Sequence, residues 1–305
     1  MKKINYHVLA LIVANLIWGA ASPIFKFSLQ NMPPFSLAFL RFLLACLIMY
    51  PFIHKKLAWS DLRNKSLWLF GLLGITINIG FFFLALEHTD SINAPIIGST
   101  GPIIILIGSI LFLKEKVKLH SIVGILLAFT GILIIILQPI INKGLDGAIL
   151  GNLLLIIATF GSVGSTLIGK KILKADNFLA FTFWSFFIGV ATFFPLMIRE
   201  FIAQPTWLAN LDYRGWIGIL FGSILSSVVA YCLYNLALAK LPAFKVSVFA
   251  YMDPVVAILI AIPLLGEKIT PVFIVGSTLV FLGILIAEKR LHWHPIHKIF
   301  NSNLE

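Results

Sequence analysis

The amino-acid sequence predicts an all-α integral membrane protein with ten transmembrane helices in two inverted five-helix repeats. Three observations lead to this fold class: the composition, a series of ten apolar stretches, and an internal repeat. Of the 305 residues, 60% are apolar and only 11% are charged, whereas about 25% of residues are charged in an ordinary soluble domain. This composition excludes a soluble globular enzyme and indicates that lipid surrounds most of the chain.

The ten apolar stretches follow one another with short linkers, and each is long enough to cross a bilayer, which takes about 20 residues. Eight of them contain no Asp, Glu, Lys or Arg: 4–25, 66–86, 91–113, 119–142, 147–169, 177–198, 215–239 and 269–287. The other two are 35–53, which contains Arg41, and 243–265, which contains Lys245 and Asp253. Because the bilayer core offers no water to the backbone, we expect a helix at every span.

The distribution of basic residues predicts the orientation. With the N-terminus in the cytoplasm, 17 of the 23 Lys and Arg residues lie on the cytoplasmic side, 5 lie outside, and Arg41 lies within the membrane. Cytoplasmic loops of membrane proteins carry such an excess of positive charge. The sequence therefore predicts a multi-pass protein of the cell (inner) membrane with both termini in the cytoplasm. The net charge of +11 reflects this orientation, and no nucleic-acid partner is predicted.

An internal repeat appears when the sequence is shifted by 152 residues. Segment 84–134 then aligns with segment 236–286 without a gap, and 17 of the 51 positions are identical. The shift places Pro102 on Pro254 and Glu115 on Glu267.

Each copy of the repeat holds five helices, an odd number, so the second copy enters the membrane from the opposite side. Inverted repeats of this kind are typical of secondary transporters. We expect a first repeat at 1–142, a second at 143–290 and a cytoplasmic tail at 291–305.

Several motifs resemble those of the drug/metabolite transporter superfamily, and within it the EamA-type transporters with two EamA repeats. They are Asn15-x-x-Trp18-Gly19 with Lys26, Leu37-Ala38-Phe39-Leu40-Arg41-Phe42, Ala85-Leu86, the spacing Pro-(x)12-Glu after Pro102 and Pro254, and Tyr251-Met252-Asp253-Pro254-Val255-Val256. The resemblance covers essentially the whole chain. It implies efflux of metabolites or amino acids by exchange or proton coupling. The first repeat departs from the acidic-Pro pattern with Gly101-Pro102.

Two prolines and two charged residues within the spans are the strongest candidates for functional residues. Pro102 and Pro254 each lie at the centre of a span, where proline kinks a helix; they are either hinges that line the site or prolines that membrane helices tolerate. Asp253 is the coupling residue that carries a proton, a ligand for a substrate amine, or a structural hydrogen-bonding group. Arg41 either clamps a carboxylate or phosphate or extends toward the outer surface.

Polar and aromatic stripes are the candidate walls of a central cavity. Asn15, Trp18 and Ser22 share one face of the first span, and Ser223, Ser227, Tyr231 and Asn235 recur at every fourth residue of the eighth. The substrate-binding candidates are Asn15, Trp18, Arg41, Asn78, Ser99, Ser162, Trp184, Tyr231, Asn235 and Tyr251. Small and hydroxyl residues also mediate helix packing in membranes, which is the alternative for each position.

Taken together, the sequence predicts a secondary active transporter, with export as the expected direction, that moves small metabolites such as amino acids by alternating access. Its expected partners are a small-molecule substrate and the lipid bilayer, with the proton as a candidate coupling ion. An integral membrane enzyme or lipid-handling protein is the alternative, and a passive channel is a third class. The chain contains no phosphate-binding loop and no hydrolase motif. His292, His294 and His297 have no neighbouring carboxylates or cysteines that could complete a metal site, so no metal is predicted. No cofactor and no enzymatic activity are predicted either.

Overall fold

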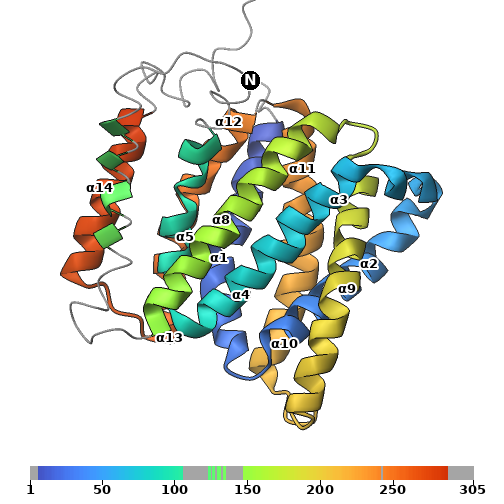
Figure 1. Ribbon diagram of the computed structural model, residues 1–305, viewed down its shortest axis with the longest axis horizontal. Coiled ribbons are helices and arrows are strands. Elements are labelled where there is room, and N and C mark those ends of the chain that lie inside the picture. Colours follow the sequence, from blue (N-terminus) through green and yellow to red (C-terminus); the bar gives the residue numbers. More distant parts are fainter. Residues whose placement is uncertain are drawn as a thin grey trace, which may run out of the picture.

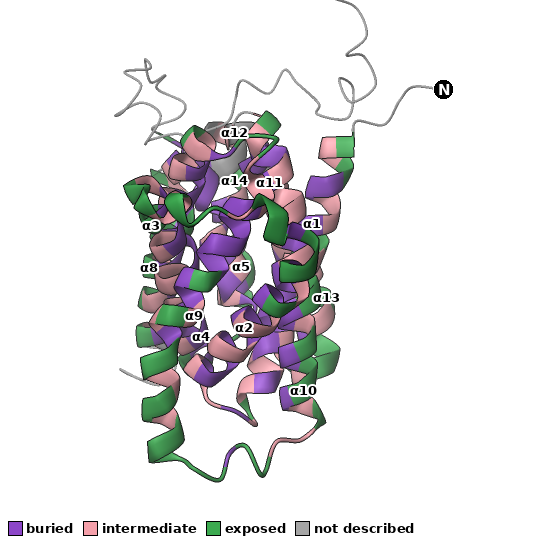
Figure 2. Ribbon diagram, turned by 90° about the vertical axis from the view of Figure 1, so that its right-hand side faces the viewer, coloured by how far each residue is buried: buried purple, intermediate pink, exposed green. Residues whose placement is uncertain are grey.

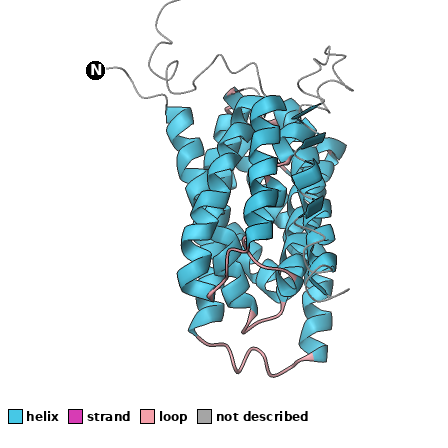
Figure 3. Cartoon of the chain, turned by 90° about the vertical axis from the view of Figure 1, so that its left-hand side faces the viewer, coloured by secondary structure: helices cyan, strands magenta, loops and turns pink. Residues whose placement is uncertain are grey.

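The structure is a computed structural model that describes residues 6–105, 123–124, 126–127, 129–131, 133–134, 147–241 and 243–287. All regular elements in these ranges are helices, which pack side by side in one bundle with the loops at its two ends (Figures 1 and 3). The predicted class, an all-helical integral membrane protein, is confirmed. Residues Glu115, Lys116 and the tail from 288 onward lie outside the described part.

In the first half, the helices are α1 (Tyr6–Leu29), α2 (Pro34–Ile53), η1 (His54–Lys56), η2 (Trp59–Arg63), α3 (Lys65–Gly71), η3 (Leu72–Ile77), α4 (Asn78–His88) and α5 (Asn93–Gly98). In the second half, they are α8 (Gly147–Ile172), α9 (Phe178–Ala203), α10 (Tyr213–Leu220), η4 (Phe221–Val229), α11 (Ala230–Lys240), α12 (Ala243–Ser247), η5 (Val248–Met252), α13 (Asp253–Leu265) and α14 (Pro271–Ala287). Both η3 and η4 are π-helical, whereas η1, η2 and η5 are 3₁₀ helices.

Six of the predicted spans are long, apolar helices in the structure. They are Tyr6–Leu29, Pro34–Lys56, Lys65–His88, Ile149–Ile172, Phe178–Ala203 and Tyr213–Lys240. Two shorter apolar helices, Phe249–Leu265 and Pro271–Gly283, follow. The predicted spans 91–113 and 119–142 extend beyond the described residues, so the number ten stays a prediction.

Local sequence explains where several helices begin and end. Proline at the first position of α2 suits a helix start, since its missing N–H has no partner there in any helix. The side chain of Asn64 accepts a hydrogen bond from the Ser66 N–H and caps α3. The C-terminal end of α13 is capped by Gly266, whose φ of +65° is the left-handed conformation that glycine adopts most readily.

The first helices of the two halves, α1 and α8, run through the bundle in opposite directions. Lys26 near the end of α1 lies 3.9 Å from Asp90, and Asn152 near the start of α8 bonds to Thr89. The last turn of α1 and the first turns of α8 therefore share one end of the bundle. We call this the Glu267 end and the opposite one, where α1 begins, the Tyr6 end.

Apolar side chains lie on both the inside and the outside of the bundle. Phe42, Phe83, Phe186 and Phe193 are fully buried in the main core, whose buried residues lie toward the inside in Figure 2. Large apolar side chains such as Phe52, Ile202 and Leu259 are exposed. Such an apolar exterior fits a bundle whose outer surface faces lipid tails.

Helix interruptions lie directly before both of the symmetry-related prolines. The chain leaves the helix at Ser99 and Thr100, then resumes it at Gly101 and Pro102. In the second half, the 3₁₀ segment η5 separates α12 from α13, and α13 begins with Asp253 and Pro254. Proline fits the first turn of each resumed helix, because a proline there forfeits no helical hydrogen bond.

Candidate functional site

A cavity of about 250 Å³ lies inside the bundle, between α1, η3, α4, α5, α8, α11 and the start of α13. Its aromatic lining residues are Trp18, Phe25, Phe70, Phe82, Tyr231 and Tyr234. Its polar and charged lining residues are Asn15, Ser22, Arg41, Asn78, Thr159, Ser162, Ser165, Thr166, Ser226, Asn235, Ser247 and Asp253. Small-molecule sites are built in this way, from an apolar wall with a few placed polar groups.

Most of the residues predicted from sequence come together around this cavity. Those in its lining are Asn15, Trp18, Arg41, Asn78, Pro102, Ser162, Tyr231, Asn235 and Asp253. Ser99, Trp184, Tyr251 and Pro254 do not line it. Whether the lining residues bind a substrate stays a prediction.

The four residues outside the lining each have another place. Ser99, directly after α5, donates to the Pro95 carbonyl of that helix at 2.7 Å. Trp184 donates to the Asp61 carboxylate at 3.3 Å and packs against Trp59 with ring centroids 5.3 Å apart. Tyr251 packs against a small second core, and Pro254 is buried at the start of α13.

Aromatic rings from α1 and α11 form one wall of the cavity. The Trp18 ring lies 5.0 Å from that of Tyr231 and 5.0 Å from that of Tyr234, both measured between centroids. Tyr231 also packs edge-on against Phe186 at 5.4 Å. The phenol of Tyr234 shares a hydrogen bond with the Thr166 hydroxyl at 3.2 Å. Rings fixed in this way give the cavity a preorganised shape.

The two π-helical segments turn backbone carbonyls toward this wall. The Gly74 carbonyl in η3 accepts a hydrogen bond from the Tyr231 hydroxyl at 3.4 Å, and the Ser226 carbonyl in η4 accepts one from the Trp18 indole at 3.1 Å. Gly74 and Ser226 differ by 152 positions, the offset of the sequence repeat. Both line the cavity, so the two halves present equivalent π-helical turns to the same space, a feature common at functional sites.

Arg41 is buried between two aromatic rings at the edge of the cavity. Its guanidinium carbon lies 4.9 Å from the centre of the Phe25 ring and 4.8 Å from that of Phe42. Its Nε donates to Ser227 Oγ at 2.8 Å and its Nη2 to Ser226 Oγ at 3.0 Å. Within the described ranges, no carboxylate lies in ion-pair distance of this arginine. The alternative, in which Arg41 extends toward the outer surface, does not fit its burial, since only 1% of this residue is exposed.

Asp253 is the only residue with a side-chain carboxylate among the described lining residues of the cavity. Its Oδ1 is enclosed and makes no hydrogen bond to the described part of the chain. The side chain lies where α1 and α13 almost touch, because a Cβ on Gly19 would stand 2.7 Å from Val256 Cβ and 3.1 Å from Asp253 Cα. An enclosed carboxylate oxygen without a partner is costly in a membrane interior, so a ligand that supplies a donor would be stabilised there.

Sequence reasoning missed several lining residues. Tyr234 and Thr166 bond to each other, yet neither falls on a predicted stripe. Ser226 lines the cavity in place of its neighbour Ser227. Tyr234 could have been found from its position three residues after Tyr231, which places both on one face of a helix.

No cluster of three potential metal ligands occurs in the ranges that the structure describes. The tail histidines His292, His294 and His297 lie outside those ranges. The site therefore consists of aromatic, hydroxyl, amide and single charged groups, which bind small molecules by shape and hydrogen bonding.

Comparison with known proteins agrees with a transport cavity. The model of the EamA-like transporter family matches residues 5–137 and 149–288. An uncharacterized transporter of Archaeoglobus fulgidus is 30% identical over 295 residues, which cover 95% of this chain and 100% of that protein. A probable amino-acid metabolite efflux pump of Escherichia coli is 25% identical over 299 residues, covering 96% and 97% of the two chains.

A solved structure, described only as the crystal structure of a protein, shares the fold with a TM-score of 0.66. It is 17% identical and covers 95% of this chain and 100% of its own. The helical bundle, the cavity inside it and the two family matches lead to one conclusion: this chain is a membrane transporter, not an enzyme, and belongs to the EamA-like transporter family.

Proposed function

We propose that this transporter exports amino acids or closely related zwitterionic metabolites across the cell membrane, by alternating access between two inverted repeats. The observation that carries the substrate class is the charge of the residues that line the cavity. Arg41 and Asp253 are the charged groups among its described lining residues, one of each sign. A zwitterion can offer a carboxylate to Arg41 and an ammonium group to Asp253.

Desolvation favours a zwitterion over a singly charged compound. Moving an uncompensated ion from water into a low-dielectric cavity costs several kcal/mol. A zwitterion that meets one charge of each sign compensates both of its own charges and both charges of the site. The cavity volume of about 250 Å³ lies just below the usual range of about 300–1,000 Å³ for ligand pockets, which suits a small metabolite.

The opposite directions of α1 and α8 and the equivalent π segments support the mechanism, because two similar halves can exchange conformations around one central cavity. The name of the Escherichia coli relative, a probable amino-acid metabolite efflux pump, supports export. Asp253, whose Oδ1 has no hydrogen-bond partner in the described part of the chain, is the candidate proton carrier. Exchange of one metabolite for another is the alternative coupling.

Exchange in proteoliposomes tests the substrate class. Liposomes containing purified protein and an unlabelled neutral amino acid are placed in radiolabelled amino acid, and competitors are added outside. We expect zwitterionic amino acids to compete at least tenfold better than their methyl esters, which lack the anion, or their N-acetyl forms, which lack the cation. Equal competition by all three forms would overturn the proposed pairing of charges.

A further inference from the structure

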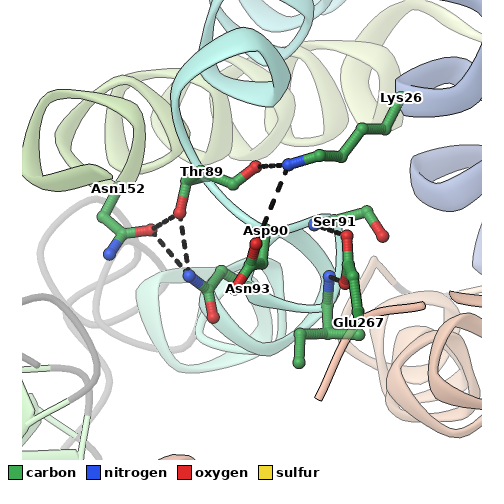
Figure 4. Close-up of polar contacts among 8 residues, drawn as sticks. Lys26, Thr89, Asp90, Ser91, Asn93, Asn152 and Glu267 are labelled. Atoms are coloured by element: carbon green, nitrogen blue, oxygen red, sulfur yellow. Dashed lines mark hydrogen bonds and ion pairs between the residues drawn. The ribbon is translucent and has the colours of Figure 1, made fainter. Parts of the chain in front are cut away.

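A hydrogen-bond network at the Glu267 end joins the two family repeats (Figure 4). Glu267 follows α13 in the second repeat. Its Oε1 accepts from the Ser91 backbone N–H at 2.7 Å, and its Oε2 accepts from the Ile92 backbone N–H at 3.1 Å. Both of its carboxylate oxygens are therefore bonded to the segment of the first repeat that leads into α5.

Further bonds hold the same segment from two other helices. Asn152 Oδ1, in α8, accepts from the Thr89 hydroxyl at 2.7 Å and from Asn93 Nδ2 at 3.1 Å. From α1, the Lys26 ammonium donates to the Thr89 carbonyl and lies 3.9 Å from the Asp90 carboxylate. Residues 89–93 are thus tied to α8, to α1 and to the segment after α13.

This network lies directly beyond the cavity. Ala94 and Pro95, the residues that follow Asn93 in α5, are part of the cavity lining. A movement that opens the cavity toward the Glu267 end by shifting the start of α5 away from α8 and from the segment after α13 must break the bonds from Asn152 and Glu267.

Helices α2 and α9 form a second contact between the repeats, the α2–α9 seam. Hydrogen bonds hold this seam near both ends of the bundle. At the Glu267 end, the Glu200 carboxylate of α9 accepts from the backbone N–H groups of Phe35 and Ser36 at 2.9 and 2.6 Å. At the Tyr6 end, Trp184 of α9 donates to Asp61. Because bonds hold this seam near both of its ends, it is suited to stay closed while the bundle moves elsewhere.

We propose that Glu267, together with Asn152, is the latch that closes the cavity at the Glu267 end and releases it during transport. This inference rests on the proposed alternating access. It also gives a physical role to the glutamate of the Pro-(x)12-Glu spacing in the second repeat. The latch acts by positioning residues 89–93 and does not touch the substrate.

The chemistry of the side chain sets the test. A carboxylate offers acceptors on both oxygens, whereas a glutamine amide offers one acceptor and one donor. Glu267→Gln therefore keeps one bond to the Ser91–Ile92 backbone and places an N–H against the other. Asn152→Ala tests the same closure without changing Glu267, because it removes the oxygen that accepts from Thr89 and Asn93.

The experiment measures access to the cavity from each side. The protein carries Ala158→Cys, at a cavity-lining position, in a background with Cys46→Ser and Cys232→Ser. A membrane-impermeant maleimide is added to either side of oriented proteoliposomes. With Glu267→Gln or Asn152→Ala, we expect labelling from the Glu267 side to rise about tenfold relative to the opposite side, which corresponds to about 1.4 kcal/mol.

Asp212→Asn is the matched control, since Asp212 lies at the same end but its carboxylate accepts bonds from Arg214 and from the Gly215 backbone, both within three residues of it. This variant should leave the ratio of labelling rates unchanged. An unchanged ratio in both latch variants, with folded protein by size-exclusion chromatography, would overturn the latch. The labelling needs no substrate, so a failure of amino-acid exchange in the unmodified protein would count against the proposed function and not against the latch.

Discussion

Arg41 and Ser227 are joined by a hydrogen bond of 2.8 Å between Nε and Oγ, which ties α2 to the π-helical segment η4. The same guanidinium reaches Ser226 through Nη2. The two serines therefore fix the plane of the guanidinium at the edge of the cavity.

Ser227→Ala should destabilise the protein. A hydrogen bond to a charged group contributes about 1.5–3 kcal/mol, and its loss leaves the Arg41 Nε without its partner. We expect a lower melting temperature in detergent, followed by tryptophan fluorescence. Ser223→Ala is the control, since Ser223 is equally buried in η4 but donates to carbonyls of its own helix. Equal melting of the two variants would show that the Arg41 bond contributes nothing.

Asp253→Asn should weaken binding of a zwitterion by a factor of about ten or more, because the loss of a charged hydrogen bond of about 1.5–3 kcal/mol exceeds the 1.4 kcal/mol per factor of ten. Uptake driven by a pH gradient should also fail, since the amide cannot titrate. Binding measured by calorimetry and uptake in liposomes check the two parts. Glu87→Gln, an exposed position away from the cavity lining, controls for the lost charge. Asp253→Asn with normal binding and uptake would assign this carboxylate a structural role.

Gly19→Ala should impair transport and stability. The added Cβ would stand 2.7 Å from Val256 Cβ, so α1 and α13 would have to separate beside Asp253. Gly98→Ala is the contrasting variant, because a Cβ there would meet nothing within 4 Å and alanine is favoured over glycine in helices by up to about 1 kcal/mol. Thermal melting should fall for the first variant and be unchanged or rise for the second.

Trp18→Phe and Trp184→Phe should differ in their effect on transport. Trp18 lines the cavity and bonds to the Ser226 carbonyl, so its loss should change the KM for substrate several-fold. Trp184 packs against Trp59 away from the cavity, so its replacement should leave KM within about twofold of the unmodified protein. If only Trp184→Phe changed KM, the substrate would bind outside the described cavity.

Reporter fusions should reveal the orientation. A reporter fused after Glu305 should be active in the cytoplasm, and one placed in the loop from Arg199 to Asp212 should be external. The expectation follows from the distribution of basic residues and from the odd number of helices in each repeat. Signals from the same compartment would contradict both arguments.

Hydrophobicity and helical periodicity in the sequence predict the helical membrane class, most spans and much of the cavity. The sequence places Asn15 and Trp18 on one helical face because residues three apart share such a face, and both line the cavity. The stripe of Ser223, Ser227, Tyr231 and Asn235 was predicted on α-helical spacing. In the structure, Ser226 and Tyr231, five residues apart, share the lining, because the π-helical segment η4 widens the turn.

Other features depend on contacts between distant segments and leave no local pattern. Trp184 was placed in the cavity because of its residue type, but its partner Asp61 lies 123 positions away. Glu267 was noticed as part of a motif, yet its bonds to the backbone of Ser91 and Ile92 cross between the repeats. A backbone N–H has no residue-specific signature, so only the folded arrangement shows such a partner.

The paired π segments also alter the backbone bonding of both halves at the same place. In a π turn the backbone hydrogen bonds join residues five apart, whereas in an α-helix they join residues four apart. Segment η3, shifted by the repeat offset of 152, falls within η4, and the family model matches each half separately. Both regions that the family model matches thus depart from α-helical geometry at the same place, and each departure leaves a backbone carbonyl, that of Gly74 or that of Ser226, bonded to an aromatic side chain of the cavity wall.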